Sequence, residues 1–399
     1  MISSRLEIDR LAAREAYNEA KRQPRESFEH LPFAMAYDGY LDCGAYPDLR
    51  ASEGPTLNKI DDLSPHTRHA WLFELKSSVP DLNSVAAGEA IELANTCWRL
   101  LPVMFPRLKE AIRSEDFFPA LDVLRARLDV LQAYEKIQHS VLITLMKSLR
   151  DTGLGPLFIK GMAAKYDVYQ TPSCRIGRDI DLAFKEEDWA AAWHHFLHLG
   201  FKPSYWSSEQ RGYVQAPSAI RKMAESGART LVQQLNHLEA GLPACLVAAN
   251  NLSDKLEQQI RRSIYSSSYP WVELPDGRLG VYIVLDILFG GNVGLPEDID
   301  SKIIMDPGRV CVVDDIPCAL PRRAVTFIQI ANKMIRYRRK NSSPFYWVHY
   351  ADLLRLSDAM KSDERLLLEE LVNSSSCRAE LISLNDEMLT LFPSFNSII

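Results

Sequence analysis

Two aspartates spaced two residues apart are the part of this sequence most suited to chemistry. Asp179 and Asp181 lie in the segment 179–184, DIDLAF, whose hydrophobic period of two predicts a β-strand. On a strand both carboxylates lie on one face, with their Cα atoms about 6–7 Å apart. Carboxylates so placed can hold Mg²⁺ ions, which bind substrate phosphates and can promote an in-line phosphoryl displacement. The alternative is that both acids face solvent on an edge strand.

A third acid, Asp286, interrupts the apolar segment 278–289, whose β-branched residues predict a central strand. A buried carboxylate is unfavourable unless it is paired or binds a metal. We therefore expect a functional role for Asp286. The alternative is that Asp286 lies at the end of the strand and caps the following turn.

A candidate anion site precedes the two aspartates in the chain. The apolar run 157–160 predicts a short buried strand, and Gly161 follows it at the start of a predicted short helix, 161–169. Backbone N–H groups and the dipole at the start of a helix favour an anion, so the turn at Gly161 and Met162 could cradle a triphosphate. The ammonium of Lys160 could reach a phosphate or a site carboxylate.

Basic residues occur on both sides of these acids in the chain. Arg175 and Arg178 could bind phosphate or form an ion pair that orients the site, and the alternative is that they are loop charges. The segment 316–351 contains no acidic residue and seven basic ones: Arg322, Arg323, Lys333, Arg336, Arg338, Arg339 and Lys340. It could face a triphosphate or an RNA, or be a solvated helix whose basic end complements its own dipole. Lys333 and Arg336, one turn apart, fit nucleotide binding best.

The elements that must position these residues follow from the hydrophobic period and from turn signals. In chain order, the sequence predicts a surface helix (3–22), an irregular segment (31–82), amphipathic helices (84–151), a strand–helix–strand–helix unit (157–200), a strand (278–289), two short strands (308–321) and C-terminal helices. The segment 203–275 shows no clean period and predicts only short helices near 218–236 and 252–264.

The 399 residues carry a net charge of −6, with 47% hydrophobic and 25% charged residues, which is typical of a globular protein of two or three domains. This composition excludes wholesale disorder and argues against a nucleic-acid coat protein or a polybasic membrane binder. The charged N-terminus predicts no signal peptide, and no apolar run is long enough for a membrane span. The seven cysteines are scattered without a CxxC pair, which indicates reduced thiols and a cytoplasmic protein.

The order of these motifs resembles the uncharacterised nucleotidyltransferase-like family within the DNA polymerase β superfamily. The residues that carry the resemblance are Lys160-Gly161, Tyr169, Arg175 and Asp179-Ile180-Asp181, and it continues at lower specificity over residues 130–360. One position departs from the wider superfamily, because Met162 stands where a phosphate-contacting serine usually follows the glycine. The resemblance implies an α/β (α+β) fold with a mixed sheet. The implied domains are a helical N-terminal extension (1–125), a polymerase-β-like catalytic core (126–320) and a helical C-terminal subdomain (321–399).

The same resemblance implies an enzyme that transfers a nucleoside monophosphate from an NTP, such as ATP, to an acceptor and releases pyrophosphate. The implied ligands of Mg²⁺, or of Mn²⁺ in its place, are Asp179, Asp181 and Asp286. The implied nucleotide-binding residues are Lys160, Gly161, Met162, Arg175, Arg178, Lys333 and Arg336. The acceptor could be a small molecule, a peptide or a protein. The alternatives are a toxin-like enzyme that acts on tRNA and a non-catalytic nucleotide-binding relative; no membrane partner is expected, and the sequence determines neither the acceptor nor the oligomeric state.

Overall fold

The computed structural model of the chain describes residues 69–73, 78–177, 179–207, 212–215, 242–266, 271–289, 294–296, 298–300, 302–339, 347–392, 395 and 397. The expectations that lie outside these residues are the helix at 3–22, most of the irregular segment 31–82, the helix near 218–236, and Arg178. Within the described ranges, no helix combines the length and the apolar character that a membrane span requires.

A nine-stranded mixed sheet lies at the centre of the fold, in the order β4-β3-β5-β7-β2-β1-β9-β8, with β6 paired to β7 outside this path. In chain order the strands are β1 (Leu157–Phe158), β2 (Ile180–Phe184), β3 (Lys202–Ser207), β4 (Gly212–Gln215), β5 (Leu242–Ala248), β6 (Trp271–Glu273), β7 (Leu279–Phe289), β8 (Arg309–Val313) and β9 (Ile316–Leu320). The expected strands are present. The sequence did not predict β3 to β6, because the segment that contains them has no clean hydrophobic period.

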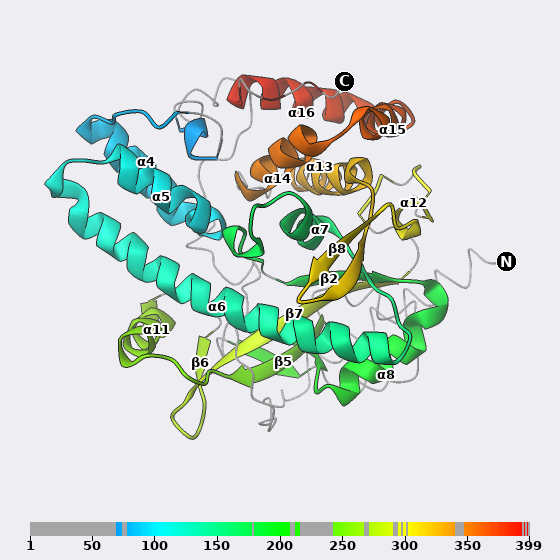
Figure 1. The fold of residues 1–399 in the computed structure, drawn as a ribbon, viewed down its shortest axis with the longest axis horizontal. Helices are drawn as coiled ribbons and strands as arrows, with labels where there is room; N and C mark the ends of the chain where they lie inside the picture. Colours follow the sequence, from blue (N-terminus) through cyan, green and yellow to red (C-terminus); the bar gives the residue numbers. More distant parts are fainter. Residues whose placement is uncertain are drawn as a thin grey trace.

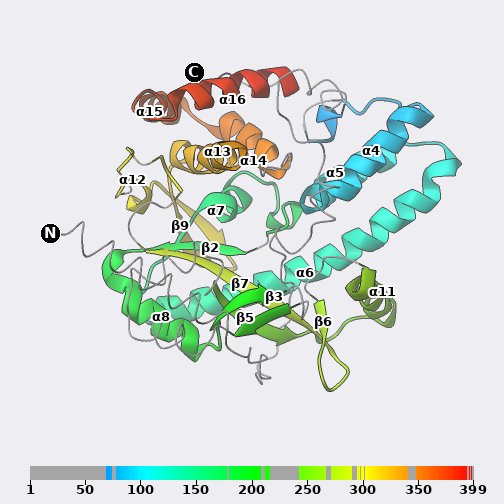
Figure 2. The same ribbon diagram turned by 180° about the vertical axis from the view of Figure 1, so that it is seen from behind.

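Helices cover both sides of this sheet (Figures 1 and 2). They are α4 (Ser84–Thr96), α5 (Leu101–Ala111), α6 (Phe118–Asp151), α7 (Lys160–Asp167), α8 (Trp189–His198), α11 (Asp254–Ser266), α12 (Lys302–Met305), α13 (Arg323–Arg339), α14 (Trp347–Ala359), α15 (Ser362–Asn373) and α16 (Arg378–Leu391), with short 3₁₀ turns between several of them. In both views α7 and α13–α16 lie on one side of the central strands and α8 lies on the other.

Three adjacent strands, β7, β2 and β1, bring together segments that are far apart in the sequence. β2 is parallel to β7, whereas β1 is antiparallel to β2 and ends just before α7. Parallel neighbours need a long crossover connection, and α8, β3, β4, β5, α11 and β6 all lie between β2 and β7 in the chain. The order of the strands therefore places the start of α7 beside β2 and β7.

Buried apolar side chains form one large cluster that includes η3 (Ala70–Leu72), α4 to α6, the sheet and the C-terminal helices. The long helix α6 is continuous from Phe118 to Asp151, so the expected boundary between residues 125 and 126 falls inside a helix. The division of the chain into three domains stays a prediction.

Candidate functional site

The three aspartates singled out by the sequence lie together. Asp181 of β2 and Asp286 of β7 are directly opposite each other in the parallel register, and Asp179 comes just before β2. One carboxylate oxygen from each lies within 4.8 Å of the others. Asp181 is buried, with 7% of its surface exposed, and the other two are half-buried. Three carboxylates at this separation are a suitable ligand set for a hard divalent cation such as Mg²⁺.

The ammonium of Lys160 reaches two of these carboxylates. Lys160 is the first residue of α7, immediately after β1, and the backbone N–H of Ile159 donates to the carbonyl oxygen of Asp181 at 3.3 Å. Lys160 Nζ lies 3.1 Å from Asp181 Oδ1 and 2.5 Å from Asp286 Oδ2. The sequence left either a phosphate or a site carboxylate as the partner of Lys160. The structure shows contacts with the carboxylates.

Burial and charge act in opposite directions on these groups. Burial by itself would lower the pKa of Lys160, but the charges of Asp286 and Asp181 outweigh it and raise the pKa above its ordinary value. Burial, together with the charge of Asp179, raises the pKa of Asp181 to about 7. Burial would also raise the pKa of Asp286, yet contact with Lys160 holds it below its usual range. The positive charge of Lys160 therefore compensates part of the negative charge of the aspartates.

The turn that begins α7 is held by backbone hydrogen bonds. The N–H of Lys160 donates to Gln329 Oε1 at 3.3 Å, and the N–H of Met162 donates to the carbonyl oxygen of Ile159 at 3.0 Å. The side chain of Met162 is buried in the core, with 2% of its surface exposed. A role for Met162 in binding the nucleotide stays a prediction, and its side chain is not the group placed to carry it out.

Beneath this turn lies a buried ion pair. Arg175 donates from Nε and Nη2 to the two carboxylate oxygens of Asp352 in α14, both at 2.8 Å, and both residues are almost fully buried. The hydroxyl of Tyr169 donates to the same carboxylate at 2.8 Å. A Cβ atom added to Gly161 would lie 2.5 Å from Arg175 Nη2, so the guanidinium supports the turn at a position only glycine can take. The sequence left phosphate binding or an orienting ion pair as the role of Arg175. The structure shows the ion pair.

Part of the chain matches a known protein family. Residues 85–239 match the profile of a family described as uncharacterised nucleotidyltransferase. The match covers less than half of the chain. The match begins in α4, earlier than the resemblance expected at residue 130, and it ends before Asp286. No curated protein and no solved structure matches the chain.

The matched segment thus contains Lys160, Gly161, Arg175 and two of the three aspartates. Asp286 and the partners from α13 and α14 come from the part of the chain beyond the match. Asp352 and Gln329 were not singled out by the sequence. A signal for Asp352 was present, because it is a lone acid in the apolar part of a predicted helix, HYADLLRL, where a carboxylate needs a partner.

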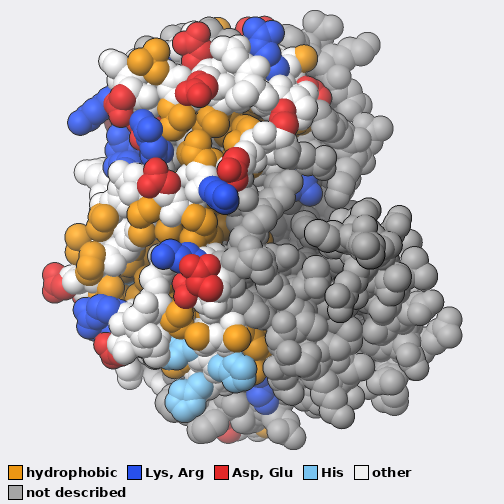
Figure 3. Space-filling model, turned by 90° about the vertical axis from the view of Figure 1, so that its right-hand side faces the viewer, with side chains coloured by type: hydrophobic (Ala, Val, Ile, Leu, Met, Phe, Trp, Pro, Cys, Tyr) orange, Lys and Arg blue, Asp and Glu red, His pale blue; other side chains and the backbone are white. Residues whose placement is uncertain are grey.

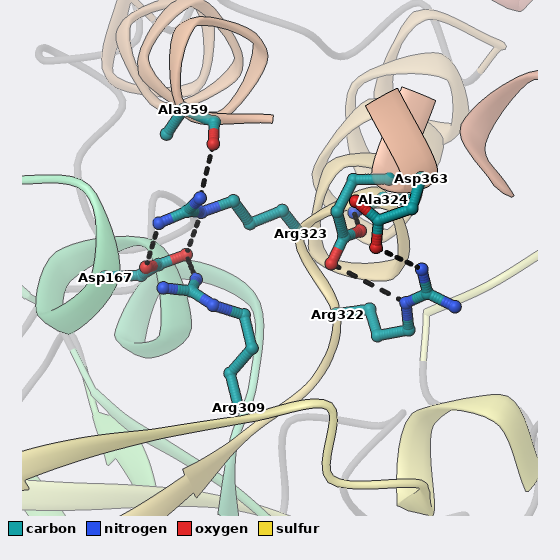
Figure 4. A network of polar contacts seen from close by, with 8 residues as sticks. Asp167, Arg309, Arg322, Arg323, Ala324, Ala359 and Asp363 are labelled. Carbon is teal, nitrogen blue, oxygen red and sulfur yellow. Dashed lines mark hydrogen bonds and ion pairs between the residues drawn. The ribbon is translucent and has the colours of Figure 1, made fainter. Parts of the chain in front are cut away.

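The basic segment 316–351 is partly neutralised by acidic side chains. Arg323 forms two hydrogen bonds with Asp167, at 2.9 and 3.0 Å, and Arg309 pairs with the same carboxylate (Figure 4). Arg322 lies 3.2 Å from Asp363 of α15 (Figure 4). These contacts join the end of α7 to β8 and α13, and connect α13 to α15. Arg322 and Arg323 therefore have acidic partners that are distant in sequence, and binding of a triphosphate or an RNA by this segment stays a prediction.

Lys333 and Arg336 lie on α13 beyond these two arginines. Lys333 is half-buried and close enough that its charge lowers the pKa of Asp181 and of Asp286, after the larger effects already named. Arg336 is exposed. On the face shown in Figure 3, acidic and basic side chains of the described residues are interspersed. Lys333 is thus the residue of this pair that faces the carboxylates, and nucleotide binding by either one stays a prediction.

Proposed function

We propose that the protein is a divalent-metal-dependent nucleotidyltransferase that transfers a nucleoside monophosphate from an NTP to an acceptor and releases pyrophosphate. The observation that carries the proposal is the convergence of Asp179, Asp181 and Asp286 within 4.8 Å. It occurs in a chain whose residues 85–239 match the profile of a nucleotidyltransferase family.

Each residue of the site has a proposed role. Asp179, Asp181 and Asp286 would hold Mg²⁺, which when bound neutralises phosphate charge and orients the reacting groups. Lys160 and Lys333 would contact the triphosphate, and the exposed Arg336 would extend this contact toward solvent. Asp286 would also accept the proton of the acceptor. Arg175 is a positioning residue, because its guanidinium is bonded to Asp352 and lies under the turn at Gly161.

Label transfer tests the proposal. The protein is incubated with each α-³²P-labelled NTP, Mg²⁺ and acceptors from each class: small molecules, peptides, proteins and tRNA. We expect one NTP to label one acceptor class, and Asp181→Asn to lower the rate at least about 100-fold, since loss of metal-assisted charge stabilisation costs several kcal/mol. Asp122→Asn, an exposed acid on α6, is the matched control and should keep the wild-type rate. Equal labelling by Asp181→Asn and wild type would refute the assignment of the aspartates.

A non-catalytic nucleotide-binding relative is the second candidate, and two observations favour it. Lys160 already neutralises Asp181 and Asp286, and Met162 replaces the usual serine. Nucleotide binding measured by calorimetry, without label transfer to any acceptor class, would support this candidate over the first.

A further inference from the structure

The ammonium of Lys160 lies against carboxylates that a metal ion would need. Nζ is 2.5 Å from Asp286 Oδ2 and 3.1 Å from Asp181 Oδ1, which are two of the three carboxylates that could hold the ion. Mg²⁺ binds carboxylate oxygens at about 2.0–2.1 Å, so an ion on these carboxylates would meet the ammonium at contact distance. Two cations at contact distance repel strongly, and one of them must leave.

The side chain of Lys160 reaches Asp181 and Asp286 from a backbone in an uncommon conformation. Its φ of 48° lies in the left-handed region, which costs a residue other than glycine about 1–2 kcal/mol. Its N–H is anchored to Gln329, so the main chain is held while the side chain can turn. The side chain passes beside Gly294, where an added Cβ would lie 3.9 Å from the ε-carbon of Lys160. A flexible four-carbon stem on an anchored backbone allows the ammonium to move without the turn moving.

We propose that Lys160 is an exchangeable counter-ion that neutralises Asp181 and Asp286 in the metal-free protein and moves to the triphosphate when a divalent cation binds. This inference rests on the proposed function and adds to it that the metal ion and the NTP bind in a coupled way. A metal ion alone must displace the ammonium from two carboxylates and leave it without a partner. When an NTP is present, its phosphates accept the displaced ammonium. Metal and NTP therefore favour each other's binding through Lys160, and the coupling is reciprocal.

Binding measurements on Lys160→Met test the exchange without relying on turnover. Mn²⁺ affinity is measured by electron paramagnetic resonance in the absence of nucleotide. The affinity for an ATP analogue with a methylene group between its α- and β-phosphates is then measured by calorimetry at saturating Mn²⁺. We expect Lys160→Met to bind Mn²⁺ at least about 5-fold more tightly and the analogue at least about 5-fold more weakly than wild type, the lower end of common coupling factors. Lys109→Met, an exposed lysine of α5, should change neither.

The opposite signs of the two effects distinguish exchange from a structural role. A lysine that only stabilises the site would weaken both affinities when replaced, and that result would overturn the proposal. Mn²⁺ binding by Lys160→Met alone, with none by wild type even when the analogue is present, would also overturn it, since Lys160 would then be a permanent occupant. If wild type and variant bind neither Mn²⁺ nor the analogue, the proposed function fails as well. If both bind both ligands with unchanged affinities, only the exchange fails.

A second measurement uses the wild-type protein, in case Lys160→Met does not fold. Hydrogen-bonded ammonium protons exchange slowly enough with water to be observed in ¹H–¹⁵N spectra of the lysine side chains. We expect such signals from Lys160 and from the buried Lys165 in the metal-free protein, and we expect the Lys160 signal to be lost or shifted when Mg²⁺ and the analogue are added together. A Lys160 signal that keeps its shift and exchange rate after both ligands have bound would contradict the movement of Lys160.

Discussion

The Cβ atom that Gly161 lacks would lie 2.5 Å from Arg175 Nη2, and Arg175 is held by Asp352 in a buried ion pair. We therefore expect Gly161→Ala to lower the free energy of unfolding by about 1–3 kcal/mol, as overpacking commonly does. Urea unfolding measures the change. Gly88→Ala is the matched control, because Gly88 lies in α4 with nothing within 4 Å of an added Cβ. It should stabilise the protein by up to about 1 kcal/mol, and equal effects of both substitutions would contradict the packing argument.

The site carboxylates repel one another when no metal neutralises them. The charge of Asp179 is, after burial, the largest cause of the raised pKa of Asp181. We expect Asp179→Asn to lower that pKa and to stabilise the metal-free protein by about 0.5–2 kcal/mol, while Mg²⁺ no longer stabilises it. Thermal unfolding with EDTA and with Mg²⁺ measures both effects. Asp122→Asn should unfold like wild type, and a less stable Asp179→Asn protein in EDTA would show that the carboxylate contributes a contact this explanation omits.

Between elements, a buried ion pair joins α6 to α7. Lys165 donates to Glu135, and both side chains are almost fully buried. Burial is the main reason that the pKa of Glu135 is raised and that of Lys165 is lowered. The cost of removing both charges from water therefore offsets much of their attraction.

The contributions of Lys165 and Glu135 to the free energy of unfolding should depend strongly on each other. We expect Lys165→Met alone to cost about 3–5 kcal/mol, since it leaves a buried carboxylate unpaired, and Glu135→Gln with Lys165→Met together to recover most of that loss. Chemical denaturation of the four proteins of this double-mutant cycle measures the coupling. Additive losses would show that the pair is not a unit.

The elements differ in how far the sequence predicted them. β2 and β7 follow from local patterns, since alternation or a run of apolar residues is visible within a few positions. β3, β4 and β5 were missed because the segment 203–275 combines Pro, Ser and Gln with apolar residues and shows no period. Their pairing is determined by neighbouring strands of the sheet, which a local pattern does not contain.

At the scale of the whole molecule, Asp352 connects the segment around the candidate site to the C-terminal helices. It is fully buried and accepts hydrogen bonds from Arg175 and from Tyr169. Arg355, one turn later on α14, lies over the Tyr169 ring at 4.6 Å and donates to the carbonyl oxygen of Phe73. The helical C-terminal part is thus a structural support for the turn that carries Lys160 and Gly161.

Loss of this connection should affect stability and the site together. We expect Asp352→Asn to cost about 3–5 kcal/mol, because the guanidinium of Arg175 remains buried without its counter-charge. Label transfer by the folded fraction should also fall, since the support under Gly161 is lost. Asp386→Asn, an exposed acid on α16, should lie within about 0.5 kcal/mol of wild type. Wild-type stability of Asp352→Asn would show that the ion pair does not hold the two parts together.

By itself the sequence determined the local features of this protein: two carboxylates two residues apart at the start of a strand, an apolar strand with Asp286 in it, and a glycine turn at the start of a helix. Each depends on residues a few positions apart. Only the tertiary structure decided which of these features meet. Lys160 and Asp286 are 126 positions apart and Arg175 and Asp352 are 177 apart, yet each pair is in contact. Burial makes an unpaired charge unfavourable, and the packing of distant segments determines which partner each charge finds.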